Sequence, residues 1–259
     1  MGDTPEKVRA GGAIATDGVN LFSFRGGNKK DFWRLNISSE TWTVLGDAPD
    51  DVNQGGALVY ANGFIYALGG DNTKNFWRYS VSAGVWEDRK DAPDKTRWGA
   101  SLAYDGSGII YGFRGDGKKD FWKYWIATDS WTSVKSTPDN VEQGGALIYL
   151  NGSVYGLRGA GKDDFWEYDI SSNSWSSLDD APANVKEGGA LTTDGTDIYA
   201  LRGDKKKDLW KYNLSSDSWT SLADAPENIK DGGGLEYLSG DFYARRGDDK
   251  ADFWKFTAP

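Results

Sequence analysis

The chain has 259 residues, of which 38% are hydrophobic and 14% aromatic. This is enough for a substantial core in one large all-β domain or in two smaller domains. The formal net charge of −9 argues against nucleic acid or an anionic membrane as the main partner. The absence of cysteine and histidine excludes thiol nucleophiles, histidine bases, zinc sites built from these residues and disulfides. We therefore expect no cofactor and no metal.

The apolar segments and the N-terminus give no sign of a membrane protein. No apolar run approaches the length of a membrane span, and residues 1–10 (MGDTPEKVRA) do not resemble a signal peptide. We expect a soluble chain without membrane insertion. If the chain is an excised fragment, a targeting segment would lie outside it.

A repeat of about 44 residues runs through the chain and determines the architecture. Prolines recur at intervals of 44 or 45 residues, at Pro5, Pro49, Pro93, Pro138, Pro182 and Pro226. A Phe-Trp or Leu-Trp pair recurs in each unit, ending at Trp33, Trp77, Trp122, Trp166, Trp210 and Trp254. Each unit opens with two small residues, at Gly11-Gly12, Gly55-Gly56, Gly99-Ala100, Gly144-Gly145, Gly188-Gly189 and Gly232-Gly233. Six such units predict an all-β fold, a six-bladed β-propeller of four-stranded repeats.

The predicted elements follow one order in every unit. In chain order they form one domain, 1–259, with a closing loop at 1–10 and blades at 11–54, 55–98, 99–143, 144–187, 188–231 and 232–259. The fourth blade reads as strands GGALIYL (144–150), SVYGLRG (153–159), DFWEYDI (164–170) and SWSSL (174–178), with Asn151-Gly152 as a tight turn. The small residues suit a crowded channel where six inner strands converge. We interpret the recurring tryptophans as packing between blades rather than as a platform for glycans.

The sixth blade is predicted to lack its outer strand. Complete units carry a second tryptophan nine residues after the first, at Trp42, Trp86, Trp131, Trp175 and Trp219. After Trp254 that position would be 263, beyond Pro259. We therefore predict 23 strands and an unpaired edge around residues 252–256. Such an edge invites pairing with another copy, so we expect a homodimer through the sixth blades and interpret the chain as a segment of a longer repeat protein.

Five blades carry an arginine at the end of the second strand and an aspartate six residues later. The arginines are Arg25, Arg114, Arg158, Arg202 and Arg246, and the aspartates are Asp31, Asp120, Asp164, Asp208 and Asp252. The second blade lacks both and has Gly69 and Asn75 instead. A five-residue loop places the two positions opposite each other, so we predict an ion pair that staples each hairpin. The tripeptide RGD at 114–116, 202–204 and 246–248 then reflects hairpin structure rather than cell adhesion.

Lysines gather in the same loops of successive blades. They are Lys29, Lys30, Lys74, Lys118, Lys119, Lys162, Lys205, Lys206, Lys207 and Lys250. We interpret them as a solvated rim, and the alternative is a positive ring that attracts an anionic ligand at the channel mouth. The inter-blade loops are acidic, and we expect them to share this face and to cancel part of that charge.

One inter-blade loop departs from the repeat. The third blade begins with KTRWGA, where others have VNQGGA, VEQGGA or VKEGGA. Arg97 and Trp98 form a candidate binding hot spot at the mouth, because tryptophan and arginine dominate such spots. The alternative is that Trp98 packs into the space left at Gly69.

Three stretches of the repeat resemble the kelch family. They are IYALGG (65–70), WEYDI (166–170) and SSDSWTSL (215–222), and the likeness covers nearly the whole chain. Kelch blades usually end the second strand with Gly-Gly, whereas here only the second blade does so. The resemblance implies a kelch-like propeller that binds proteins through one face. Some kelch-like propellers isomerise sialic acid, and the copper-radical oxidase chemistry of another is excluded by the missing cysteine and histidine.

We predict a non-enzymatic binding or scaffold propeller that engages a protein or another ligand through the channel-mouth face. Candidate ligand-binding residues are Arg97, Trp98, Arg25, Arg114, Arg158, Arg202 and Arg246, and no catalytic or metal-binding residue is assigned. One alternative is an acidic-sugar isomerase whose mouth arginines hold a carboxylate. The other is a glycan-binding or surface-adhesion domain, so an anionic or glycan ligand stays open.

Overall fold

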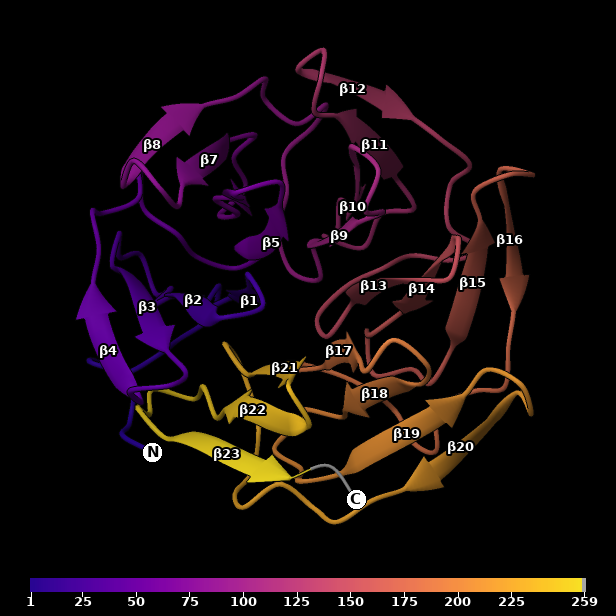
Figure 1. The fold of residues 1–259 in the computed structure, drawn as a ribbon. Coiled ribbons are helices and arrows are strands. Elements are labelled where there is room, and N and C mark those ends of the chain that lie inside the picture. Colours follow the sequence, from indigo (N-terminus) through magenta and orange to yellow (C-terminus); the bar gives the residue numbers. More distant parts are fainter. Residues whose placement is uncertain (258–259) are drawn as a thin grey trace.

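The strands form six small antiparallel sheets arranged around one axis, as the blades of a six-bladed β-propeller (Figure 1). The computed structural model describes residues 1–257, so the end predicted for the sixth blade at residue 259 lies outside the described residues. Residues 1–257 contain strands β1 to β23. None of them belongs to a helix long and apolar enough to cross a membrane. The predicted fold class and the 23 strands are confirmed.

Each blade takes its strands from one stretch of the chain, inner strand first. The first blade has β1 (Ile14–Thr16), β2 (Asn20–Phe24), β3 (Phe32–Asn36) and β4 (Thr41–Val44). The second has β5 (Ala57–Ala61), β6 (Phe64–Leu68), β7 (Phe76–Ser80) and β8 (Val85–Asp88). The third has β9 (Ser101–Tyr104), β10 (Ile109–Phe113), β11 (Phe121–Trp125) and β12 (Ser130–Ser133).

The last three blades repeat this order, and the sixth has three strands. The fourth blade has β13 (Ala146–Leu150), β14 (Ser153–Leu157), β15 (Phe165–Asp169) and β16 (Ser174–Ser177). The fifth has β17 (Ala190–Thr193), β18 (Ile198–Leu201), β19 (Leu209–Asn213) and β20 (Ser218–Ser221). The sixth has β21 (Gly234–Leu238), β22 (Asp241–Arg245) and β23 (Phe253–Thr257).

The hairpins form where the sequence predicts them. Asn151 and Gly152 both have positive φ, 51° and 93°, as a tight turn between β13 and β14 requires. The strands are slightly shorter than predicted, since β13 begins at Ala146 and not at Gly144. Gly144 (φ 86°) turns the chain into the blade, and its left-handed conformation does not fit a strand.

The core lies between neighbouring blades. Phe165 of the fourth blade contacts Tyr212 and Trp219 of the fifth, with ring centroids 4.9 and 5.0 Å apart. The Trp219 indole also donates a hydrogen bond to the carbonyl of Asp179 at 2.9 Å. Trp86, Trp131 and Trp175 donate in the same way to the blade before them, and Trp42 donates to the carbonyl of Gly2 in the N-terminal segment. The tryptophans therefore pack between blades, as the sequence predicts.

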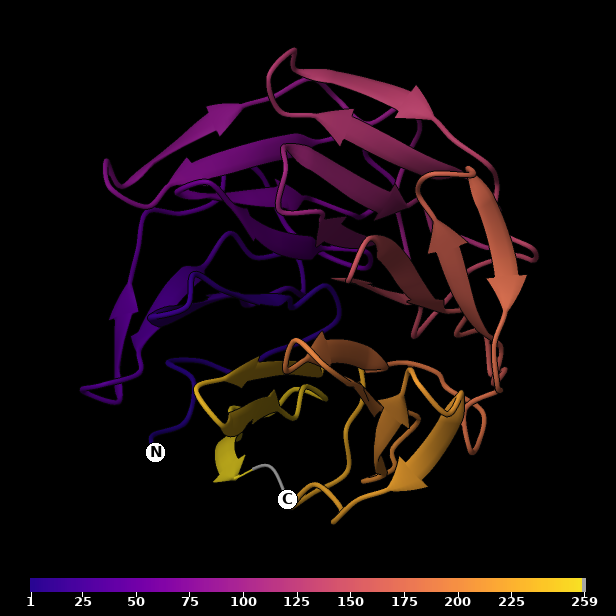
Figure 2. The ribbon, with the colours of Figure 1, turned by 45° about the vertical axis from the view of Figure 1, so that its right-hand side comes forward.

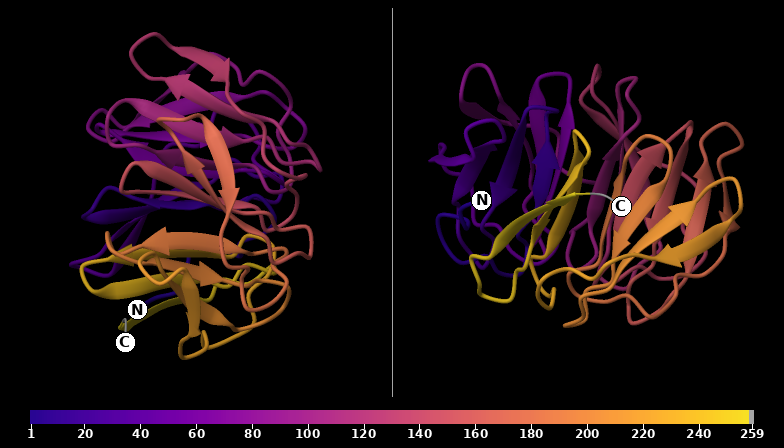
Figure 3. Two further views of the ribbon diagram at one scale, coloured as in Figure 1. Left: turned by 90° about the vertical axis from the view of Figure 1, so that its right-hand side faces the viewer. Right: turned by 60° about the horizontal axis from the view of Figure 1, so that its bottom comes forward.

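The N-terminal segment closes the ring. Val8 forms a β-bridge with Lys250 of the sixth blade, just as Val52 does with Lys29 between the first two blades. The Thr4 amide donates to the carbonyl of Ala251 at 2.9 Å. Figure 3 shows this segment between the first and sixth blades. Residues 1–10, predicted as a closing loop, make these contacts, and we call this segment the clasp.

The sixth blade ends at β23, and no strand of residues 1–257 pairs with its outer edge (Figure 2). Trp254 is only partly buried, whereas the matching Trp210 of the fifth blade is 2% exposed. Phe256 is also partly buried, whereas its counterpart Tyr212 is buried. The three-stranded sixth blade predicted from the sequence is therefore confirmed, and two of its aromatic side chains are incompletely covered.

Candidate functional site: the channel and its mouth

The inner strands β1, β5, β9, β13, β17 and β21 surround a channel along the axis (Figure 1). The channel holds a cavity of about 320 Å³ lined by glycines, aliphatic side chains and a few polar ones. Above it lies a smaller pocket of about 100 Å³, which we call the mouth. One ring of small residues lines both spaces: Gly12, Gly56, Ala100, Gly145, Gly189 and Gly233.

Close approach of the blades explains the paired small residues. Gly55 has a φ of 91°, and a Cβ there would collide with the backbone carbonyl of Arg97 in the next inter-blade loop. A Cβ on Gly56 would lie 2.6 Å from a methyl of Val52. These glycines let the loops converge around the channel, which places the loop residues that precede them at the mouth.

The mouth is lined by one side chain from each inter-blade loop. These residues are Ala10, Gln54, Trp98, Gln143, Glu187 and Asp231. In the order of the ring, Trp98 stands opposite Asp231, and Glu187 is next to Asp231. Desolvation, followed by the charge of Glu187, raises the pKa of the Asp231 carboxyl. The mouth therefore has an aromatic side and an acidic side.

All five predicted arginine–aspartate pairs are present. The nitrogen–oxygen distances are 3.3 Å for Arg25–Asp31, 3.2 Å for Arg114–Asp120, 3.0 Å for Arg158–Asp164, 3.4 Å for Arg202–Asp208 and 3.5 Å for Arg246–Asp252. Arg114 also contacts Asp94 at 2.9 Å and donates to the carbonyl of Lys95 at 3.2 Å. Arg25, Arg114, Arg158 and Arg202 thus tie their hairpins to a neighbouring loop through a bond from Nε to a backbone carbonyl, whereas the Nε of Arg246 has no partner among the described residues. Three of the five, Arg25, Arg114 and Arg158, contact two carboxylates each.

The lysines of the same loops have a structural role beyond solvation. Lys207 donates a hydrogen bond from Nζ to the carbonyl of Pro226 at 2.8 Å. Lys30, Lys74 and Lys119 donate to Pro49, Pro93 and Pro138 in the same way. A β-bridge between Lys206 and Ile229 places the lysine loop beside the acidic inter-blade loop. The two kinds of loop therefore share one face, as predicted.

Trp98 lies at the mouth, and Arg97 stacks against its ring. Trp98 is partly exposed and lines the mouth, and the Arg97 guanidinium lies 4.0 Å from the centre of its ring. The alternative position for Trp98, in the space at Gly69, is wrong. A Cβ at Gly69 would first meet Trp77, at 2.8 Å, and then Asn75.

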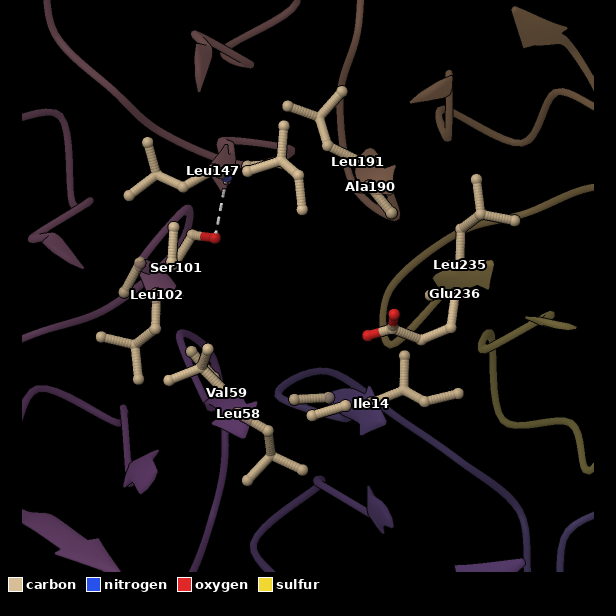
Figure 4. Close-up of a pocket in the computed structure, with 18 of the residues that line it drawn as sticks. Ile14, Leu58, Val59, Ser101, Leu102, Leu147, Ala190, Leu191, Leu235 and Glu236 are labelled. Atoms are coloured by element: carbon tan, nitrogen blue, oxygen red, sulfur yellow. Dashed lines mark hydrogen bonds between the residues drawn. The ribbon is translucent and has the colours of Figure 1, made fainter. Parts of the chain in front are cut away.

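A partly buried carboxyl that projects into the channel was missed at the level of sequence. Glu236 on β21 projects into the cavity, as Figure 4 shows. The matching residues of the other blades are Ala15, Val59, Ala103, Ile148 and Thr192. Burial raises the pKa of the Glu236 carboxyl to about 8. Alignment of the six repeats would have singled it out as the one charged residue at this position.

A buried arginine was missed as well. Arg245 replaces the phenylalanine or leucine found in the other blades and is fully buried between the sixth and first blades. It donates from Nη1 to the Ser23 hydroxyl at 2.6 Å and to the carbonyls of Ala13 and Phe24, and from Nε to the carbonyl of Gly232 at 2.7 Å. Desolvation lowers its pKa to about 9. Ser23 is the only hydroxyl at a position that other blades fill with alanine or glycine.

Comparison with known proteins yields structural relatives. No family model matches the chain, and no curated protein matches it. The solved "Structure of YjhT" superposes with a TM-score of 0.76 at 14% identity, covering 99% of this chain and 97% of that one. A structural genomics protein of unknown function from Bacteroides thetaiotaomicron superposes with a TM-score of 0.71 at 16% identity, covering 99% of this chain and 71% of that one. These likenesses establish the fold alone.

Proposed function

We propose that this chain is a kelch-like, non-enzymatic propeller that binds a protein through the face containing the mouth. The observation that carries the proposal is the pair Arg97 and Trp98, in which a partly exposed indole lies under a guanidinium at 4.0 Å. Tryptophan and arginine are the residues most enriched in binding hot spots. The pair also occupies the one inter-blade loop whose sequence departs from the repeat at the mouth.

The charges around the mouth define what the partner presents. Glu187 and Asp231 form no ion pair with any residue of 1–257, and both line the mouth on the side away from Trp98. A partner with an apolar or aromatic group for Trp98 and a basic group for the two carboxylates fits both sides. Such complementarity speeds association and selects partners.

The geometry of the other arginines favours binding over catalysis on an acidic sugar. An isomerase of that kind would use free mouth arginines to hold the substrate carboxylate. Here Arg25, Arg114, Arg158, Arg202 and Arg246 are each paired with an aspartate. The tryptophans of the third and fourth strands pack between blades, which likewise favours a protein partner over a stacked glycan.

Selection of peptide ligands tests this proposal. A displayed peptide library is enriched on the wild-type protein, and the affinities of the selected peptides are measured for Trp98→Ala, Arg97→Gln and the control Trp125→Ala. Trp125 is 38% exposed on β11 and does not line the mouth, so it controls for loss of any accessible tryptophan.

We expect basic peptides that lose about 30-fold in affinity for Trp98→Ala, the effect of a hot-spot truncation. Affinity for Trp125→Ala should be unchanged. Selected peptides that bind Trp98→Ala as tightly as wild type, or a selection that enriches none, would contradict the proposal.

A further inference from the structure

The cavity inside the channel carries one acidic side chain and no basic one among the described residues that line it. That residue is Glu236, whose carboxyl extends from β21 toward the axis (Figure 4). The wall around it consists largely of aliphatic side chains, among them Ile14, Leu58, Leu147 and Leu191. A carboxyl placed among such groups is costly unless it finds a partner.

Glu236 has no such partner within the protein. No residue of 1–257 donates a hydrogen bond to its carboxyl or forms an ion pair with it. Ser101 in the wall accepts a hydrogen bond from the Leu147 amide at 3.0 Å, and it makes no hydrogen bond to Glu236. The Glu236 carboxyl therefore lacks a hydrogen-bond donor and a positive charge, and a ligand in the cavity would supply one of them.

Arg245 belongs to the same blade but does not supply the missing charge. Its Nη1 and Nε atoms donate to Ser23 and to backbone carbonyls, and no ion pair joins it to Glu236. Its side chain is fully buried, so no part of the guanidinium is open to the cavity. An anionic ligand in the channel would meet Glu236 and not Arg245, which argues against an anion there.

We propose that the channel binds a small organic cation, a primary ammonium on a compact apolar body, with the ammonium paired to Glu236. A cation compensates the partly desolvated carboxylate, and the aliphatic side chains of the wall accommodate the apolar body. A volume of about 320 Å³ is at the small end for a ligand site, which restricts the ligand to a compact molecule. This site is separate from the mouth residues Arg97 and Trp98.

Binding also moves a proton. Burial holds the pKa of the Glu236 carboxyl at about 8, so the empty channel contains the neutral acid at pH 7. An ammonium favours the carboxylate, and the carboxyl proton passes to solvent as the ion pair forms. A neutral ligand of the same shape releases no proton.

Calorimetric titration with three probes of matched shape tests the proposal. The probes are benzylammonium, benzyl alcohol and phenylacetate, titrated near pH 7 into wild type, Glu236→Gln and two mouth variants, Glu187→Gln and Trp98→Ala. Glutamine keeps the shape of the protonated acid, and circular dichroism confirms that each variant is folded. Repeating the benzylammonium titration in buffers of different ionisation enthalpy counts the protons released.

We expect benzylammonium to bind wild type about tenfold or more tightly than either other probe, a difference typical of one buried charge pair. Glu236→Gln should remove this advantage and the proton release, while both mouth variants leave them unchanged. Equal affinity for benzylammonium and benzyl alcohol, no binding of benzylammonium, or unchanged binding by Glu236→Gln would overturn the proposal. A loss confined to Glu187→Gln would place the cation at the mouth and overturn it too. Trp98→Ala tests the proposed protein-binding surface and leaves the channel site intact. The cation proposal can therefore be wrong while the protein-binding proposal holds, and the reverse.

Discussion

The fifth and sixth blades are neighbours built from the same repeat, yet they bury different charges. The fifth buries Asp197, which forms an ion pair with Lys211 of the same blade at 2.6 Å. Where the fifth blade buries Leu201, the sixth buries Arg245. Where the fifth buries Thr192, the sixth directs Glu236 into the channel. The fifth covers Trp210 with an outer strand, whereas Trp254 of the sixth is only partly buried. The fifth blade shows which residues a blade needs in order to fold. The departures in the sixth blade are residues that folding of the repeat does not require.

Two residues that depart from the repeat contact each other across the interface between the sixth and first blades. Arg245 meets Ser23 of the first blade, and both depart from the repeat. A fully buried guanidinium tolerates few neighbours, because each of its donors needs an acceptor. The interface that closes the ring is thus more specific than the apolar interfaces between other blades.

The largest expected effect is the loss of Arg245. Arg245→Ala removes four hydrogen bonds and leaves a cavity, and we expect unfolding by urea to show a loss of about 3–5 kcal/mol. The matching change in the fifth blade, Leu201→Ala, is the control for a simple cavity. Arg245→Leu combined with Ser23→Ala restores the pattern of other blades and should recover most of the loss. A double variant no more stable than Arg245→Ala would show that the pair is not the cause.

The next effect is the pH dependence caused by Glu236. The pKa of this carboxyl rises from an ordinary 4.5 to about 8 on folding. Between these values the unfolded chain has released the proton and the folded chain keeps it, so wild-type stability falls as pH rises. At about 1.4 kcal/mol per pKa unit, this rise in the pKa corresponds to about 5 kcal/mol. Because the Glu236 side chain is only partly buried, solvent reduces the effect, and we expect Glu236→Gln to gain about 2–4 kcal/mol relative to wild type between pH 4 and pH 8.5. Glu142→Gln, outside the cavity, serves as the control, and parallel stability curves for wild type and Glu236→Gln would contradict the assignment.

A smaller effect is expected from completing the sixth blade. Residues 213–222 of the fifth blade, grafted after Phe256, supply an outer strand and cover Trp254. We expect a gain of about 1–3 kcal/mol, or a few degrees in melting temperature for a domain of this size. We also propose that β23 pairs with a second copy through its open edge, so the graft should reduce dimer in analytical ultracentrifugation. The same graft with serine in place of its tryptophan is the control, and an unchanged melting temperature would argue against an incomplete blade.

The smallest effect concerns the hairpin ion pairs. Arg202–Asp208 of the fifth blade and Arg246–Asp252 of the sixth are joined at 3.4 and 3.5 Å and are partly exposed. A double-mutant cycle with Arg202→Gln and Asp208→Asn should give a coupling of about 0–1 kcal/mol that shrinks in high salt. The same cycle in the sixth blade should agree with it, because this motif does not depend on the outer strand. A coupling several times larger in one blade would show that the two hairpins are not equivalent.

The predictable part of the structure is the part set by contacts within one repeat. Blade number, hairpin turns such as Asn151-Gly152, the arginine–aspartate pairs and the three-stranded sixth blade all follow from spacing and turn chemistry. The position of Trp98 stayed open, because it depends on how six loops converge. Glu236 and Arg245 are visible as departures from the repeat, but their surroundings are not, because the curvature of the closed ring decides whether a strand residue faces the axis or the next blade.

The clasp has a consequence for the order of folding. Contacts inside a blade join residues a few tens of positions apart, whereas the Val8–Lys250 bridge and the Arg9–Asp249 ion pair, at 2.8 Å, each join residues about 240 apart. Closing so long a loop carries an entropy cost that short hairpins avoid. The blades can therefore assemble one against the next before the two ends of the chain meet, as in an open solenoid. Closure would then be the last step of folding, and its reversal the first step by which the ring comes apart.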